Sequence, residues 1–209
     1  MMTLSSARPA LLLLLLATIW SSSFGFIKVG VETIPPMTLA AVRIIMAALL
    51  LYGVARFKGM TIPKDKKFWW LAFLIGIFGN GLPFTLIGWG EQTIDSGLAA
   101  ILMSVMPLAT ILLLHVFSSD ERLTLAKMSG IVVGFCGVVV LVGPEALKGL
   151  GGDAVRQIAV ACGAMCYAIA TTIAKNVPRL HPAVSGTAVM TMGAIQMTVL
   201  SLLFDQPWL

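Results

Sequence analysis

The sequence predicts an all-α polytopic membrane protein with about seven transmembrane helices. Of its 209 residues, 58% are hydrophobic and 11% are charged, whereas soluble domains are about 45–50% apolar and about 25% charged. So little charge cannot cover a water-facing surface, and the mean hydropathy of +0.98 agrees with this. A further observation is the length of the apolar segments, because a membrane-spanning helix needs about 20 predominantly apolar residues.

Seven apolar segments are separated by short polar breaks that contain Pro or Gly. None of them has more than one charge in its interior, and six reach the lower length for spanning a bilayer. The segments are 10–27, 37–55, 68–90, 96–117, 128–142, 157–174 and 183–204.

The first segment has two interpretations, because Arg8 and the leucines at 11–16 also resemble the start of a secretion signal. A signal peptide ends at a small-residue cleavage site, whereas this apolar stretch continues through Trp20 and Phe24. We therefore expect an uncleaved first helix.

The distribution of Lys and Arg predicts the orientation. Ten of these 14 residues fall in loops on the side of the N-terminus and three on the opposite side. Basic residues gather in cytoplasmic loops, so we expect a multi-pass protein of the plasma (inner) membrane with a cytoplasmic N-terminus. The net charge of +5 is then explained by basic loops beside a lipid bilayer, which is the expected partner. No nucleic acid partner is expected.

Several mid-span positions of the first and second segments could line a binding site. Ser22 belongs to a small-polar stripe of the first segment, and Trp20 and Phe24 share another face; packing against neighbouring helices is the alternative for all three. Arg43 lies about 9 Å inside the second segment at about 1.5 Å per residue. Intramembrane charges are usually paired or face water, so pairing with Glu91 or Asp95 and snorkelling to the interface are both open.

The third and fourth segments each contain a deep proline, Pro83 and Pro107. A proline removes one helical hydrogen bond and frees the carbonyl group four residues back, here those of Gly79 and Met103. Asn80 lies beside the first of these. Broken helix geometry at membrane depth is tolerated where it lines a cavity or is buried in protein, so the two breaks are candidate cavity walls or plain packing kinks.

The sixth segment repeats features of the first at an offset of 147 residues. The matched features are a mid-helix aromatic residue, a lysine at the helix end and a loop proline: Trp20, Lys28 and Pro36, against Tyr167, Lys175 and Pro182. Five spans separate the two copies, so they enter the membrane in opposite orientations. Inverted repeats of this kind are typical of secondary transporters, and we expect Trp20 and Tyr167 to face each other.

Four stretches of the sequence resemble an EamA domain. They are ATIWSSSFGFIKVG (17–30), PPMTLAAVRIIMAALLL (35–51), LPFTLIGWGEQTIDSGLAAILMSVMPLATILLL (82–114) and DERLTLAKMSGIVVGFCGVVVLVG (120–143). This domain is the repeat unit of the drug/metabolite transporter superfamily. The resemblance implies ten helices in two inverted five-helix repeats around a substrate cavity. It divides the chain into a first repeat (10–143), an inter-repeat loop (144–156) and a partial second repeat (157–209).

The resemblance also implies that about 81 residues and three helices of the second repeat are missing. We therefore expect this stretch alone to insert but not to transport, unless a homodimer or a separate partner completes the bundle.

The function expected from the resemblance is secondary active transport of a small organic metabolite or drug by alternating access, with export as the expected direction. No G-x-x-x-x-G-K phosphate loop is present, so a substrate or proton gradient would supply the energy in place of ATP. No cofactor, metal site or catalytic residue is expected. A membrane-embedded enzyme and a non-transporting scaffold are the alternatives. The candidate substrate-binding residues are Trp20, Ser22, Phe24, Arg43, Asn80, Pro83, Pro107 and Tyr167.

Overall fold

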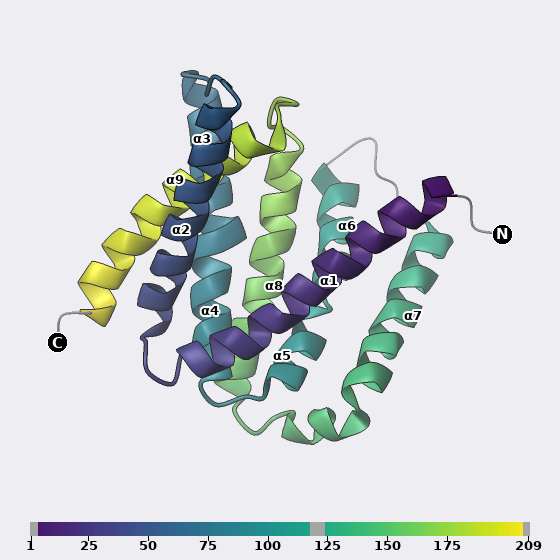
Figure 1. Cartoon of the computed structure of the whole chain (residues 1–209). Helices are drawn as coiled ribbons and strands as arrows, with labels where there is room; N and C mark the ends of the chain where they lie inside the picture. The colour runs from purple at the N-terminus through teal and green to yellow at the C-terminus, as the bar shows by residue number, and fades with distance from the viewer. Residues whose placement is uncertain (1–3, 118–123, 207–209) are drawn as a thin grey trace.

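The computed structural model describes residues 4–117 and 124–206, and within these ranges all regular structure is helical (Figure 1). Five helices are continuous: α1 (Leu4–Gly30), α2 (Pro36–Phe57), α7 (Leu125–Val142), α8 (Ala154–Ala174) and α9 (Pro182–Leu200). Short irregular turns follow two of them, a 3₁₀ turn η2 (Pro144–Gly149) after α7 and a π-helical turn η3 (Ser201–Asp205) after α9.

Two spans are interrupted in mid-membrane. One consists of α3 (Lys66–Gly76), a π-helical turn η1 (Ile77–Gly81) and α4 (Leu82–Glu91). The other consists of α5 (Ser96–Met103) and α6 (Met106–Phe117).

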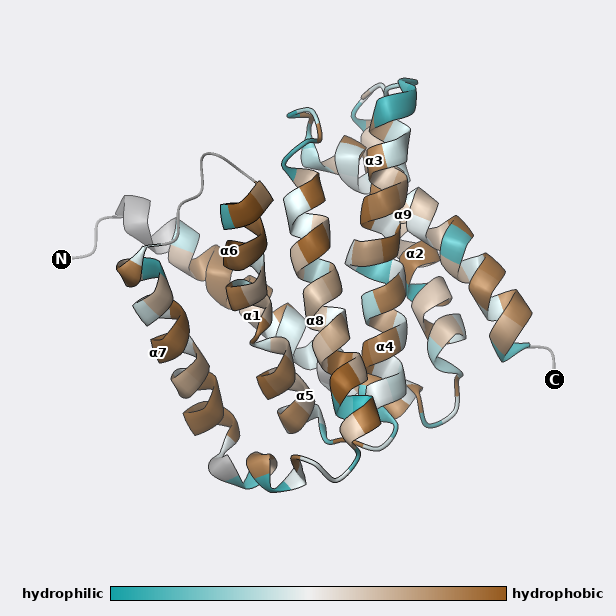
Figure 2. Cartoon of the chain, turned by 180° about the vertical axis from the view of Figure 1, so that it is seen from behind, coloured by the Kyte–Doolittle hydropathy of each residue, from teal (hydrophilic) through white to brown (hydrophobic). Residues whose placement is uncertain are grey.

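The predicted all-α membrane fold is confirmed. Within the described ranges, seven helical stretches are long and apolar enough to cross a bilayer, and each overlaps one predicted segment. They are Pro9–Gly30, Pro36–Phe57, Lys66–Glu91, Ser96–Phe117, Leu125–Val142, Ala154–Ala174 and Pro182–Asp205. Apolar residues follow the lengths of the helices, and many of the hydrophilic ones lie at helix ends and in connections (Figure 2).

The connections fall at the two ends of the bundle. Those between α1 and α2, α4 and α5, and α7 and α8 lie at one end, and those between α2 and α3 and between α8 and α9 lie at the other (Figure 1). The end that holds the α1–α2 connection is called the loop end below.

The last two helices pack against several of the earlier ones. α8 contacts α4, α5 and α6, and α9 lies across α2 and α3. The core divides accordingly: Ile87, Leu98 and Val160 form one buried cluster between α4, α5 and α8, and Ile44 and Met197 form another between α2 and α9.

Polar side chains cap several helix starts. Asp65 accepts a hydrogen bond from the Phe68 amide, which begins α3, and Asp153 accepts one from the Arg156 amide, which begins α8. Such caps satisfy amide donors that the first helical turn leaves free.

The cap of α2 comes from the far end of the chain. Asp205 Oδ2, at the end of η3, accepts hydrogen bonds from the Thr38 amide (2.7 Å) and the Thr38 hydroxyl (2.9 Å). The Ser201 hydroxyl lies 2.8 Å from the Thr38 hydroxyl. A carboxylate at a helix N-terminus also interacts favourably with the helix dipole, so the start of α2 and the end of α9 are joined.

Helices α1 and α7 lie at the periphery. The leucines at 11–16 of α1 are each more than half exposed, and no described residue of α7 is buried. Both helices therefore present apolar side chains outward.

Backbones approach closely where α3 meets α9. A Cβ atom placed on Gly76 would lie 2.9 Å from the Gly193 nitrogen and 3.0 Å from the Gln196 side-chain oxygen. Small residues allow such contacts between membrane helices, so Gly76 permits the α3–α9 packing. By contrast, a Cβ on Gly130 of α7 would meet no atom within 4 Å.

We predict that Gly76→Ala destabilises the protein, because backbone atoms of α9 cannot move aside as a flexible side chain would. Overpacking of this kind costs about 1–3 kcal/mol, which should lower the thermal unfolding midpoint in detergent by several degrees. The matched control is Gly130→Ala, which should leave the midpoint unchanged or raise it slightly. Equal midpoints for Gly76→Ala and the unmodified protein would contradict the close approach.

Candidate functional site

Proline determines both mid-membrane breaks. Pro83 has no amide hydrogen to donate to the Gly79 carbonyl, and the turn before it widens into η1, where the Leu82 amide bonds to the Ile77 carbonyl five residues back. Pro107 likewise has no donor for the Met103 carbonyl, and Ser104 and Val105 form a turn between α5 and α6. The two predicted helix breaks are therefore present.

A cavity of about 330 Å³ lies beside these breaks, within the size range of small-molecule sites. We call it the Arg43 cavity, and its walls come from α1, α2, η1, α4, α5, α8 and α9. The lining residues with polar or aromatic side chains are Trp20, Ser23, Arg43, Asn80, Phe84 and Tyr167. Gly79 and Met103, whose carbonyl groups lose their helical donors, also line it.

Arg43 supplies the positive charge of this cavity. Its Nη2 donates to the Ser23 hydroxyl of α1 at 2.8 Å, and its guanidinium carbon lies 4.7 Å from the centre of the Phe84 ring. Within the described residues it forms no ion pair, so the predicted pairing with Glu91 is not formed. A guanidinium group has five donors, and this one keeps donors available to a ligand.

Two further aromatic rings line the cavity. The Trp20 and Tyr167 rings lie 6.4 Å apart, tilted by 39°, which is a favourable distance for an aromatic pair. Each of them lies near the middle of its span, so the rings are available to flat or apolar groups at membrane depth.

Asn80 supplies an amide at the widened turn. Its side chain is 5% exposed and lies on the cavity wall, and in the described part of the chain it makes no side-chain hydrogen bond. Buried amides normally have partners, so Asn80 is available to a polar group of a ligand.

Four of the candidate residues, Trp20, Arg43, Asn80 and Tyr167, thus meet around one cavity. Three others do not line it. Ser22 is exposed and bonds to the Ile19 carbonyl of its own helix, Pro83 is buried in the bundle, and Pro107 is exposed. The side chain of Phe24 lies outside the described residues.

Sequence reasoning missed several lining residues, among them Ser23, Phe84 and Met190. The spacing of Trp20, Ser23 and Ile27 places them on one helical face, and this signal could have favoured Ser23 over Ser22. Phe84 follows Asn80 by one helical turn. Nothing in the sequence distinguishes Met190 from other apolar residues of α9.

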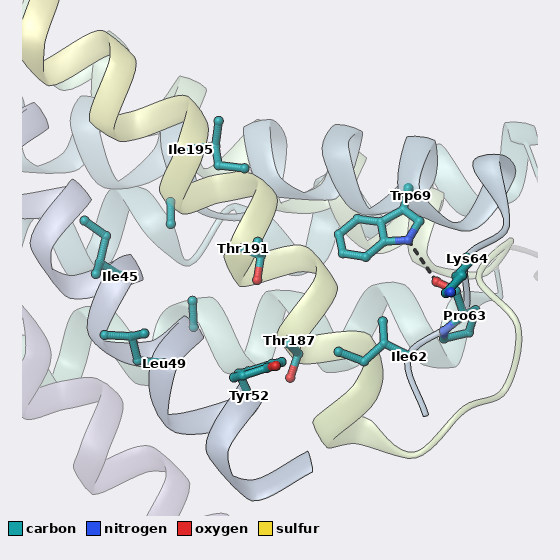
Figure 3. Close-up of a pocket in the computed structure, with 12 residues that line it drawn as sticks. Ile45, Leu49, Tyr52, Ile62, Pro63, Lys64, Trp69, Thr187, Thr191 and Ile195 are labelled. Atoms are coloured by element: carbon teal, nitrogen blue, oxygen red, sulfur yellow. Dashed lines mark hydrogen bonds between the residues drawn. The ribbon is translucent and has the colours of Figure 1, made fainter. Parts of the chain in front are cut away.

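A larger groove of about 590 Å³ lies between α2 and α9 near the start of α3 (Figure 3). Its walls are mostly apolar, with Ile45 and Leu49 from α2 and Ile195 from α9. The Trp69 indole donates to the Pro63 carbonyl at 2.8 Å, and the Thr187 hydroxyl donates within its own helix. The Trp69 and Thr187 groups are thus already bonded, and the other polar side chains of this groove are Tyr52, Lys64 and Thr191.

The Arg43 cavity therefore combines one cation, one free amide and three aromatic rings near mid-membrane. These groups can hold a small amphipathic molecule. Among the described residues, no group of three or more His, Cys, Asp and Glu side chains could hold a metal ion.

Comparisons with known proteins agree with this reading. The model of the EamA-like transporter family matches residues 7–143. The chain is 30% identical over 190 residues to an uncharacterised transporter of Archaeoglobus fulgidus, covering 88% of this chain and 64% of that protein. It is 25% identical to the uncharacterised inner membrane transporter YedA of Escherichia coli, covering 88% of this chain and 59% of YedA.

A third relative carries a more specific name. The chain is 31% identical over 140 residues to a probable terminal-alkyne amino-acid exporter of Streptantibioticus cattleyicolor, covering 67% of this chain and 46% of that protein. The chain thus spans 46–64% of the lengths of these three relatives. No solved structure gives a significant match.

Proposed function

Because this chain belongs to the EamA-like transporter family, we propose that it moves a small organic metabolite or drug across the inner membrane through the Arg43 cavity. The observation that carries the proposal is the meeting of Trp20, Arg43, Asn80 and Tyr167 around one cavity. The cavity would open to each side in turn, with a substrate or proton gradient as the source of energy in place of ATP.

The groups of the cavity favour an organic anion, namely a carboxylate with a compact apolar body. The Arg43 fork matches a carboxylate in geometry and charge, and Trp20, Phe84 and Tyr167 suit the apolar part. The relative named as a probable terminal-alkyne amino-acid exporter supports this class, because an amino acid carries a carboxylate group. Its name also supports export as the direction.

Transport requires the walls of the cavity. In the whole protein expressed from its gene, we predict that Trp20→Ala and Asn80→Ala each abolish uptake and efflux of 3-phenylpropionate or phenylalanine in vesicles while membrane insertion stays normal. Trp70→Ala and Asn176→Ala are matched controls, because both side chains are exposed and distant from the cavity lining. Normal transport in both cavity variants would remove these residues from the site.

The preference for an anionic substrate should depend on Arg43. A hydrogen bond to a charged group contributes about 1.5–3 kcal/mol, so Arg43→Met should weaken binding of 3-phenylpropionate by roughly 10- to 100-fold. Arg43→Lys should bind with intermediate affinity, because an ammonium group lacks the planar fork. Phenylethylamine, which lacks the carboxylate, should compete poorly with 3-phenylpropionate for binding to the unmodified protein.

The control for this experiment is Arg56→Met, because Arg56 is an exposed arginine of the same helix. Titration calorimetry on the purified protein measures the affinities. Equal affinity of Arg43→Met and Arg56→Met for 3-phenylpropionate would contradict the proposed substrate class.

The orientation is tested by labelling single cysteines in a background without Cys136, Cys162 and Cys166. We predict that Lys58→Cys reacts with a membrane-impermeant maleimide only from the cytoplasmic side, and Thr93→Cys only from outside, because basic residues are retained in the cytoplasm. Labelling of both positions from the same side would contradict the seven-span topology, and labelling with the two sides exchanged would contradict the cytoplasmic N-terminus.

A further inference from the structure

Glu91 is a fully buried acid at the C-terminal end of α4, at the loop end of the bundle. Its side chain is 0% exposed, and neither carboxyl oxygen has a hydrogen-bond partner within the described residues. Buried charged groups without partners are costly, and ionisable groups inside membrane segments usually have a function. The structure therefore has an acid here that no packing or capping contact explains.

Two basic side chains close to Glu91 are bonded to the backbone. Lys28 Nζ from α1 donates to the Glu91 carbonyl at 2.5 Å and the Ile94 carbonyl at 3.2 Å. Arg156 Nη1 from α8 donates to the Trp89 carbonyl at 2.5 Å and the Gln92 side-chain oxygen at 2.7 Å. Both cations thus stabilise the carbonyl end of α4, where positive charge is favourable, and neither is bonded to the Glu91 carboxyl group.

The other charged groups near this end have different roles. Asp153 at the start of α8 accepts from the Thr93 hydroxyl and the Arg156 amide, and Asp95 before α5 is exposed. Electrostatic interactions at the Glu91 carboxyl group come from two cations, Lys28 and Arg43, and the Ser96 hydroxyl lies near it.

The interaction with Arg43 connects Glu91 to the Arg43 cavity. Arg43 is the charged residue of the cavity lining, and Ile87, one helical turn before Glu91 on α4, lines the same cavity. The two charged groups are thus close enough to interact electrostatically. An ionised Glu91 and an anionic substrate would therefore share the positive charge of one guanidinium group. Protonation of Glu91 leaves that charge to the substrate alone.

We propose that Glu91 carries a proton that crosses the membrane together with the anionic substrate. The proposal rests on the function proposed above and adds the coupling ion and its binding residue. On binding, one carboxylate oxygen of Glu91 forms an O–H bond with the proton, and release breaks this bond. The substrate anion binds more tightly when the proton is present, and by linkage the proton binds more tightly when the anion is present. Anion and proton then cross as an electrically neutral pair, so the substrate gradient drives export of this pair and an inward proton gradient opposes it.

Binding of 3-phenylpropionate at two pH values tests the proposal. The two pH values are about 6 and about 8, and the carboxylate of the probe stays ionised at both. The unmodified protein should bind the probe at least about 5-fold more weakly at the higher pH. Glu91→Gln, which imitates the protonated acid, should bind tightly at both, and the exposed-loop control Glu32→Gln should behave like the unmodified protein.

Three outcomes of this experiment have distinct meanings. The same pH dependence in Glu91→Gln as in the unmodified protein overturns the role of Glu91, and so does pH-independent binding by the unmodified protein. Failure of the unmodified protein to bind any carboxylate probe instead overturns the substrate class proposed above.

Chemical labelling of the unmodified protein gives a second test that needs no variant. Dicyclohexylcarbodiimide modifies protonated carboxyl groups in apolar surroundings, and peptide mass spectrometry locates the product. Glu91 should be modified faster at the lower pH, and 3-phenylpropionate should accelerate the reaction. Absence of modification at Glu91, or a rate that the probe does not change, overturns the proposal even if Glu91→Gln fails to fold.

Discussion

Inside a bilayer, no water is available to bond to a peptide N–H or C=O group, so each must find its partner within the protein. Pro83 and Pro107 each remove one donor from this hydrogen-bonding system. The chain widens one turn into η1 before Pro83 and inserts a turn at Ser104 before Pro107. The carbonyl groups that lose their donors belong to lining residues of the Arg43 cavity. The position of the cavity therefore follows from where the helices are interrupted.

Directional contacts, more than buried area, hold the helix that covers this cavity. α1 is largely exposed, yet Ser23 bonds to Arg43, Lys28 bonds to the end of α4, and Trp20 contacts Tyr167. Elements with few buried apolar contacts open at a lower free energy than core elements. The wall that α1 contributes is thus the one that separates most easily from the rest of the bundle.

The sequence was sufficient to predict the spans, because continuous apolar runs and polar breaks are one-dimensional signals. It also predicted both helix breaks, since proline chemistry acts locally. The approach of Trp20 to Tyr167 was predicted from their equivalent positions in the proposed internal repeat. The sequence could not determine which side of a helix faces inward. Ser22 was predicted to line the site, but Ser23 lines the cavity. Pro107 lies at a helix break as predicted, but its ring is exposed. The sequence also could not show that Lys28 bonds to the end of α4, because the carbonyl groups that it binds are more than sixty residues away.

The contact between Asp205 and Thr38 joins two helices that already pack along each other, α2 and α9. Because α2 and α9 are joined both along their lengths and at one end, they would move together as a rigid body. An opening in which this pair moves would carry Arg43 away from Tyr167 on α8 while the separation of Thr38 and Ser201 stays constant. The bending would concentrate in the turn Ile77–Gly81, whose wider hydrogen-bond rings and two glycines make it the natural hinge of the bundle.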